Sequence, residues 1–252
     1  MVTTRTEFIM NKKIIEIRNL HYSYPDGTKA LRDISMDIFE HESVGIVGPN
    51  GAGKSTFLLH LNGYFSGDHH VLINGMPVTQ ENLPKIRKDV GIVFQDADTQ
   101  LFMLTVFDDV AFGPLNMGLS DEEVRNRVRT ALSEVSMTGY EQRAPYHLSG
   151  GEKRAVAIAT VLAMEPKIVV MDEPTSNLDP RTRRQLINLL KTFSLTKIIA
   201  SHDLEMILDL CPRAILIDEG YVVADGPTIE LFSNLDLMEK HGLEKPLSLG
   251  GK

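Results

Sequence analysis

Short apolar runs recur along the chain, and most of them are bounded by Gly, Pro or Asp. Runs of this length with turn residues at their ends are typical of β-strands. They lie at residues 14–20, 43–47, 71–73, 89–93, 168–172, 197–201, 214–217 and 221–224. Asp218, Glu219 and Gly220 separate the last two runs, so we expect a hairpin there.

Helical patterns fill much of the chain between these runs. Ser120 and Glu123 have the spacing of a capping box, which predicts the start of a helix. Pro180 stands where a first-turn proline belongs, before another helical stretch. The order of elements predicts an α/β fold with an N-terminal antiparallel β subdomain, a parallel core sheet and a helical subdomain inserted at about residues 96–160.

Composition places the chain among globular proteins. Of its 252 residues, 42% are hydrophobic and 24% are charged, a balance too apolar for a disordered chain. The 26 basic and 34 acidic residues give a net charge of -8, which argues against a nucleic-acid-binding surface. The single cysteine, Cys211, cannot form an internal disulfide and fits a reducing compartment. No apolar run approaches the ~20 residues of a membrane-spanning helix.

The strongest local signal is a glycine-rich loop between a predicted strand and an apolar helical run. The sequence GPNGAGKST at residues 48–56 matches the pattern GxxxxGKS in that context. Glycines let backbone N–H groups converge on phosphate oxygens, and the helix N-terminus adds the positive end of its dipole. Lys54 would neutralise charge on the β- and γ-phosphates, and Ser55 would hold Mg²⁺ through its hydroxyl. The expected phosphate-binding residues are Gly48, Pro49, Asn50, Gly51, Ala52, Gly53, Lys54, Ser55 and Thr56.

Two carboxylates, Asp172 and Glu173, stand at the end of the apolar run 168–172. A buried strand in an α/β sheet delivers such residues to its carboxyl end, where ligands bind. Asp172 would orient Mg²⁺ through its water shell, and Glu173 would polarise an attacking water. The sequence therefore predicts hydrolysis as well as binding.

The segment LSGGE at residues 148–152 suggests a second anion-binding site. Ser149 and Glu152 form a capping box, but Gly150 and Gly151 weaken the start of a helix by about 1 kcal/mol each. The two glycines are explained if another group approaches that helix end closely. A phosphate-binding loop and a separate helix end suited to phosphate suggest an active site shared between two chains.

Together, in this order along the chain, the motifs resemble the ATPase subunit of an ATP-binding-cassette (ABC) transporter. The resemblance implies a RecA-like P-loop fold over residues 12–232, with ATP and Mg²⁺ as its cofactors. Residues 1–11 are then an N-terminal extension, in which Met10 is an alternative start, and residues 233–252 are a tail.

The resemblance also assigns roles to residues outside the phosphate loop. It implies that Gln95 joins the Mg²⁺ shell and senses the nucleotide, and that His202 contacts the γ-phosphate and positions the water with Glu173. Asp179 belongs to a loop that crosses the dimer interface, where Ser149, Gly150 and Gly151 of one chain meet the nucleotide of the other. Tyr24 resembles the aromatic residue that stacks on adenine; a tyrosine that only belongs to the sheet is the alternative, and Tyr22 competes for the role.

Because no membrane span is expected, the resemblance requires separate integral membrane subunits, with the ATPase peripheral on the cytoplasmic side of the membrane. In the family a coupling helix of the membrane partner docks beside the glutamine loop, here residues 95–113. Residues 100–112 are rich in Leu, Phe, Met and Val, which indicates helical core with part of the stretch forming a groove. The ATPase would pair with itself or with a similar second chain, and no nucleic-acid partner is expected.

The segments 95–102 and 109–118 resemble the cobalt/nickel and energy-coupling-factor branch of importers, which take up metal ions or vitamins. Ala97, where that branch usually has Pro, and Ala155, where an Arg is common, depart from the pattern. The tail is short, and residues 205–211 and 241–248 resemble those of metal importers, which favours cobalt or nickel over vitamins as the cargo. A soluble ABC-type ATP switch that acts on nucleic acid or ribosomes is the alternative from another class. A module that binds without hydrolysing is disfavoured by Asp172, Glu173 and His202.

Overall fold

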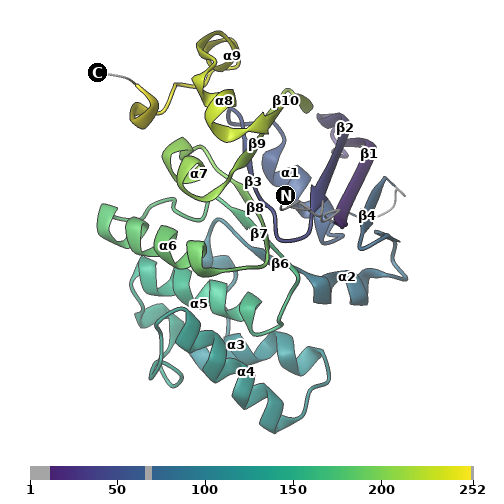
Figure 1. Cartoon of the computed structure of the whole chain (residues 1–252). Helices are drawn as coiled ribbons and strands as arrows, with labels where there is room; N and C mark the ends of the chain where they lie inside the picture. The colour runs from purple at the N-terminus through teal and green to yellow at the C-terminus, as the bar shows by residue number, and fades with distance from the viewer. Residues whose placement is uncertain (1–11, 66–69, 251–252) are drawn as a thin grey trace, which may run out of the picture.

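Two β-sheets form the framework of the computed structural model, which describes residues 12–65 and 70–250 (Figure 1). The smaller sheet is antiparallel, with the order β2-β1-β4-β5. In the larger sheet the order is β10-β9-β3-β8-β7-β6, and all neighbours are parallel except β10, which pairs antiparallel with β9. The strands are β1 (Lys13–Ser23), β2 (Lys29–Phe39), β3 (Ser43–Val47), β4 (Val71–Ile73), β5 (Met76–Pro77), β6 (Val90–Val93), β7 (Ile168–Asp172), β8 (Thr196–Ala200), β9 (Arg213–Asp218) and β10 (Tyr221–Pro227).

Helices cover both faces of the larger sheet. They are α1 (Lys54–Leu61), α2 (Leu83–Asp89), α3 (Val106–Asn116), α4 (Asp121–Glu134), α5 (Gly150–Leu162), α6 (Pro180–Thr192), α7 (Leu204–Leu210), α8 (Thr228–Ser233) and α9 (Leu235–Lys240). Successive strand residues point to opposite faces, so Ile46 and Val170 join a core with α1 and the smaller sheet, whereas Val47 and Met171 join a core with α5, α6 and α7. In Figure 1, α3 and α4 lie beside α5 at the lower end of the molecule.

The α/β class, the parallel core sheet, the antiparallel N-terminal sheet and the helical subdomain are confirmed. The predicted strands 43–47, 71–73 and 168–172 have the bounds of β3, β4 and β7, and the other predicted strands differ only at their ends. Ser120 and Glu123 form the predicted capping box before α4, Ser149 and Glu152 form another before α5, and Pro180 is the first residue of α6. Tyr221 pairs with Asp218 in the expected hairpin.

Several elements are missing from the sequence-based prediction, and the longest is β2. Its register against β1 shifts between the pairs Leu20↔Ile34 and Tyr22↔Leu31, and Asp33 lies there in the left-handed region with φ 61°. This bulge places two residues between the buried Leu31 and Ile34 instead of one, so the strict alternation of a strand is broken. Helix α7 was also not predicted, and the C-terminal part contains two short helices, α8 and α9, where one was expected.

The predicted extension at residues 1–11 lies outside the described residues. Over residues 12–65 and 70–250, no helix combines the length and the apolar character that crossing a bilayer requires.

α5 contacts the first turn of α6 at Gly151. A Cβ on Gly151 would overlap Cγ2 of Thr182, whose hydroxyl donates a 2.5 Å hydrogen bond to Asp179. A Cβ on Gly150, by contrast, would have no heavy atom of the described residues within 4 Å. Packing inside the chain therefore accounts for Gly151, and Gly150 is left open to a partner.

This contrast predicts different effects of two neighbouring substitutions on stability. Gly151→Ala should lower the free energy of unfolding by about 1–3 kcal/mol, because Thr182 must turn away from Asp179 to make room. Gly150→Ala, the matched control, should be neutral or stabilise the protein by up to about 1 kcal/mol through helix propensity. Urea denaturation of both variants measures the difference, and equal effects would contradict the packing argument.

Candidate active site

The glycine-rich loop connects β3 to α1 and leaves the helix N-terminus without a side-chain cap. Gly53, which precedes the helix, has φ 104°, and Gly48 has φ 149°. A Cβ on Gly48 would collide with the carbonyl oxygen of Ile217, so only glycine fits there. The first backbone N–H groups of α1 are consequently available to an anion, as the sequence predicts.

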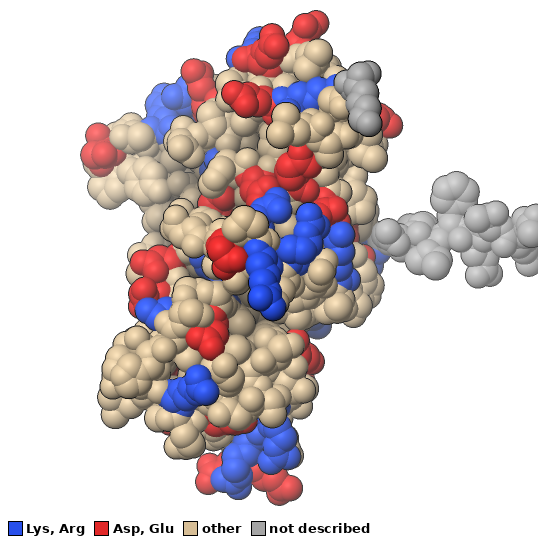
Figure 2. Space-filling model, turned by 90° about the vertical axis from the view of Figure 1, so that its left-hand side faces the viewer, with Lys and Arg blue, Asp and Glu red and all other residues tan. Residues whose placement is uncertain are grey.

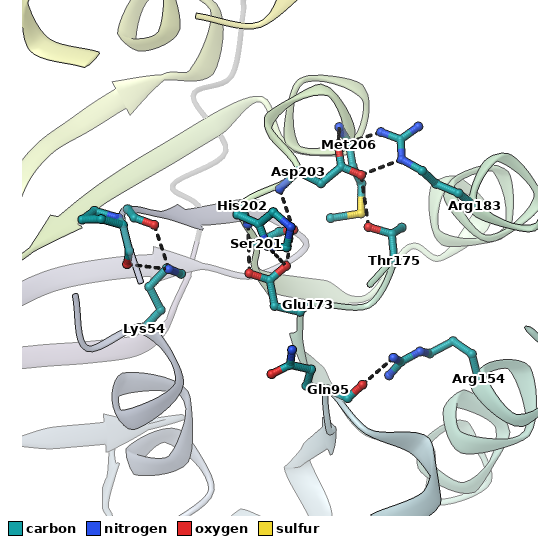
Figure 3. Close-up of polar contacts among 12 residues, drawn as sticks. Lys54, Gln95, Arg154, Glu173, Thr175, Arg183, Ser201, His202, Asp203 and Met206 are labelled. Atoms are coloured by element: carbon teal, nitrogen blue, oxygen red, sulfur yellow. Dashed lines mark hydrogen bonds and ion pairs between the residues drawn. The ribbon is translucent and has the colours of Figure 1, made fainter. Parts of the chain in front are cut away.

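Lys54 begins α1 and folds back over its own loop (Figure 3). Its Nζ donates to the carbonyl oxygens of Gly48 (2.7 Å) and Pro49 (2.9 Å). Burial lowers the pKa of Lys54, while the negative charges of Glu173 and Asp172 act to raise it. The ammonium group is thus held by neutral carbonyls, from which a phosphate could attract it.

Asp172 ends β7 and forms a side-chain hydrogen bond with Ser55 at the start of α1. Burial raises the pKa of Asp172, and its Oδ1 is buried with no hydrogen-bond partner among the described residues. Hydroxyl and carboxylate oxygens are the ligands that Mg²⁺ prefers, with substrate phosphates and water completing its shell. Ser55 and Asp172 therefore fit the predicted Mg²⁺ site. No cluster of three or more His, Cys, Asp or Glu elsewhere in the described chain could hold a metal by itself.

Glu173 is only 7% exposed and lies in the left-handed region with φ 46°. Its carboxylate accepts hydrogen bonds from the Ser201 hydroxyl (2.8 Å) and from the backbone N–H of His202 (3.0 Å). Nδ1 of His202 lies 2.9 Å from the same carboxylate (Figure 3). A strained backbone that persists in a buried acidic residue is typical of functional sites. The carboxylate is oriented from three directions, as a group that must hold a water molecule in one position requires.

His202 is largely exposed, with 66% of its side chain accessible, and it follows β8 as expected. Asp203, the next residue, accepts two hydrogen bonds from Arg183 of α6, at 2.6 and 2.7 Å, and one from Thr175 at 3.1 Å. Ser201 and His202 both contact Glu173, whereas the Asp203 carboxylate is bonded to Arg183 and Thr175, so these three consecutive residues do not form a hydrolase triad.

Tyr24 lies beside the phosphate loop, and its hydroxyl is 2.8 Å from that of Thr56. Its ring contacts Tyr22 edge to face, with centroids 5.2 Å apart, and Phe65 at 5.9 Å. The half-buried Tyr24 is therefore next to the loop, as an adenine-stacking residue must be, and Tyr22 is packed against His60. This arrangement favours Tyr24 over Tyr22 for the adenine role, which stays a prediction.

Of the residues expected to act on a second chain, Ser149, Gly150 and Asp179 are exposed and Gly151 is half-buried. Ser149 caps α5, and Asp179 caps α6 by accepting hydrogen bonds from the backbone of Arg181 and Thr182. α5 packs on the opposite face of the larger sheet from α1, so the phosphate loop and Ser149 lie on different sides of the sheet. This geometry fits a site completed by a partner chain.

Two residues that contact the predicted site residues were not predicted from the sequence. Ser201 donates to Glu173, and Arg154 of α5 donates to the backbone carbonyl of Gln95 at 2.5 Å, beside the exposed Gln95 side chain. In the sequence Arg154 follows Lys153, another cation, directly before the apolar run of α5, so nothing local distinguishes it as the buried one. Ser201 had no local signal, because its partner belongs to a distant strand.

Comparison with known proteins gives matches over most of the chain. The family model of ABC transporters matches residues 31–176. A putative ABC transporter ATP-binding protein of Geobacter sulfurreducens is 56% identical over 245 residues, covering 96% of this chain and 98% of the relative. EcfA, an energy-coupling factor transporter ATP-binding protein of Methanothermobacter thermautotrophicus, is 49% identical over 239 residues, covering 92% of this chain and 77% of the relative.

Solved structures agree with these relatives. CbiO1 from Clostridium perfringens, part of the ABC transporter complex CbiONQ, has a TM-score of 0.79 and 38% identity, covering 91% of this chain and 94% of that one. The ATP-binding cassette MJ0796, a dimer in a post-hydrolysis state with ADP and Pi, has a TM-score of 0.75 and 29% identity, covering 85% and 98%. Because such relatives match almost the whole chain, we conclude that it belongs to the ATPases of the ABC transporter family, which hydrolyse ATP with the help of Mg²⁺.

Proposed function

We propose that this chain is the ATP-hydrolysing subunit of an energy-coupling-factor type importer, peripheral on the cytoplasmic side of the membrane. The observation that carries the importer assignment is a set of exposed apolar residues in and directly after the glutamine loop, called here the apolar patch. It consists of Phe102, Leu104, Phe112 and Leu115, of which Leu104 is 83% exposed. A relative named EcfA and a structural neighbour from the CbiONQ complex support the same branch.

Hydrolysis would use residues from four loops. Lys54 and the N-terminus of α1 bind the β- and γ-phosphates, and Ser55, Asp172 and Gln95 hold Mg²⁺, which supplies charge neutralisation at the phosphates. Glu173 accepts a proton from the attacking water. His202 contacts both the Glu173 carboxylate and the γ-phosphate and so fixes their relative position. Tyr24 stacks on the adenine.

Two chains would be needed for one complete site. Ser149, Gly150 and Gly151 of one chain would contact the nucleotide bound to the loop of the other, with Asp179 at the interface. The open space at Gly150 and the exposure of Ser149 support this arrangement.

The membrane subunit would dock on the apolar patch. Phe102 and Phe112 contact each other edge to face with centroids 5.2 Å apart, so the two rings form a common surface. Buried Val106 and Val110 anchor α3 beneath it. Stretch 100–112 thus contains the buried residues of α3 that were expected as helical core, and the groove expected in the same stretch stays a prediction.

Cobalt or nickel ions are the first proposed cargo, and a vitamin is the second. The described part of this chain holds no cluster of metal-ligating side chains, so the cargo would be bound by the membrane subunits. The alternative of a soluble switch acting on nucleic acid or ribosomes has weaker support. Figure 2 shows that Lys and Arg gathered at mid-height on one face adjoin Asp and Glu, and Arg184 pairs with Asp209 at 2.5 Å.

The role of Glu173 can be tested by changing its charge. Glu173→Gln should lower the ATPase rate by about 10²–10⁴-fold, because the proton acceptor is lost. ATP affinity should stay near that of the wild type, and an ATP-bound dimer should accumulate. Steady-state turnover and size-exclusion chromatography measure these effects, with exposed Glu230→Gln as the control. Turnover near the wild-type rate would rule out Glu173 as the base.

The shared site predicts complementation between two inactive chains. Ser149→Ala should slow hydrolysis without weakening ATP binding to the monomer, and Lys54→Ala should abolish binding. A mixture of the two chains should recover part of the activity, because a mixed dimer has one intact site. Either an absence of recovery or full activity in strictly monomeric protein would contradict the two-chain site.

The docking patch predicts a separation of partner binding from catalysis. Leu104→Glu should abolish recovery of an integral membrane partner from detergent-solubilised membranes, while the ATPase rate of the isolated protein stays unchanged. Leu247→Glu, at another exposed leucine, is the control. Recovery of the chain with ribosomes or DNA, and not with a membrane protein, would support the alternative function.

A further inference from the structure

Arg154 is a buried cation with no ion-pair partner in the described part of the chain. It is 5% exposed, and its two terminal nitrogens donate to the carbonyl oxygens of Phe94 (2.6 Å) and Gln95 (2.5 Å), while Nε is buried without a partner. Burial lowers the pKa of Arg154, and the negative charge of Asp96 acts to raise it. Burying a guanidinium group whose direct partners are neutral carbonyls is costly. The planar guanidinium group has two donors at fixed positions, so it can hold the carbonyls of Phe94 and Gln95 in one orientation.

The same stretch of backbone is attached to α5 by a second side chain. Gln100 accepts a hydrogen bond from the N–H of Phe94 (3.1 Å) and donates to the carbonyl of Ala157 and to Thr160, both at 2.8 Å. The N–H and the C=O of Phe94 are therefore both bonded to α5 or to a side chain anchored on it. Lys153 adds an outer ion pair with Asp98 at 2.5 Å.

On its other side, α5 borders an open pocket of about 800 Å³, which is lined by residues 134–140, the N-terminal part of α5 and one face of α6. Ala155 and Gln185 are among its lining residues. Ala155 occupies the position at which the sequence analysis noted a missing Arg. The N-terminal part of α5 thus contacts the glutamine-loop backbone through short hydrogen bonds and borders this pocket toward α6.

One rigid helix carries both Ser149 and Arg154. They are five residues apart, which places them about 7.5 Å apart along the axis at 1.5 Å per residue. Figure 3 shows Gln95 between Glu173 and the Arg154 side chain, at the end of the strand that leads into the glutamine loop.

We propose that Arg154 is a positioning residue that fixes the backbone of Gln95 to the helix that presents Ser149. Any movement of α5 then shifts Gln95 in one nucleotide site and Ser149 in the site of the partner chain together. The inference rests on the proposed roles of Gln95 and Ser149. It adds the physical link that makes the two sites respond as one.

The test compares four variants of the full chain in the Glu173→Gln background, which removes turnover: Arg154→Met, Arg154→Lys, Gln95→Ala and the double variant Arg154→Met/Gln95→Ala. Lys153→Met is the control, because it removes only the exposed ion pair of the same helix. Two quantities are measured: the Mg²⁺ concentration for half-maximal binding of a fluorescent ATP analogue, and hydrogen–deuterium exchange of residues 94–101.

Arg154→Met should raise the half-maximal Mg²⁺ concentration by about tenfold, as for other residues that orient metal ligands. Exchange at 94–101 should accelerate, while exchange in β7 stays unchanged. The double variant should be no worse than Gln95→Ala alone, because Arg154 acts through Gln95. Arg154→Lys, which keeps the charge but not the fork of two donors, should show a smaller shift in the same direction. Lys153→Met should leave the Mg²⁺ dependence unchanged and affect exchange only near its partner Asp98.

Wild-type Mg²⁺ dependence and exchange in Arg154→Met would overturn the proposal, and so would independent, multiplying effects in the double variant. If Arg154→Met does not fold, Arg154→Lys decides by the same two measurements. If Gln95→Ala leaves the Mg²⁺ dependence unchanged, the proposed role of Gln95 is wrong, and the exchange data still decide whether Arg154 holds the loop.

Discussion

The site depends on the parallel direction of neighbouring strands in the larger sheet. β3, β8 and β7 lie side by side and run the same way, so the loops after them must meet at one edge. Lys54, His202 and Glu173 come from those three loops. Residues that are far apart in the sequence are thereby brought to one place by backbone hydrogen bonding alone.

The charged side chains at this edge are stabilised by hydrogen bonds to neutral groups as much as by opposite charges. Lys54 is satisfied by carbonyl oxygens of its own loop, and Glu173 by the Ser201 hydroxyl and the N–H of His202. The ammonium and the carboxylate are each stable when buried without forming a close pair that a nucleotide would have to break. The orphaned Oδ1 of Asp172 is the polar atom left over, and a cation bound with the phosphates would satisfy it.

The helix end proposed to contact the nucleotide of a partner chain lies on the opposite face of the same sheet. The exposed Ser149 caps the start of α5, while the second turn of α5 holds the glutamine-loop backbone through Arg154. The helix is thus connected both to the site of its own chain and to the surface offered to a partner. Gly151, required by contact with Thr182, fixes the helix against α6, and Gly150 leaves the approach free.

The sequence by itself determined those features whose interactions are all formed among a few consecutive residues. The glycine-rich loop, the capping boxes at Ser120 and Ser149, and the first-turn Pro180 could all be predicted, because their interactions span about four residues. Strand β2 could not, since the bulge at Asp33 removes the alternation by which a strand is recognised. Only the tertiary structure decided that Ser201 supports Glu173 and that Arg154 is buried against Phe94 and Gln95. Each of these contacts joins residues that are far apart in the sequence. They come together only when the sheet assembles and α5 packs against the end of β6.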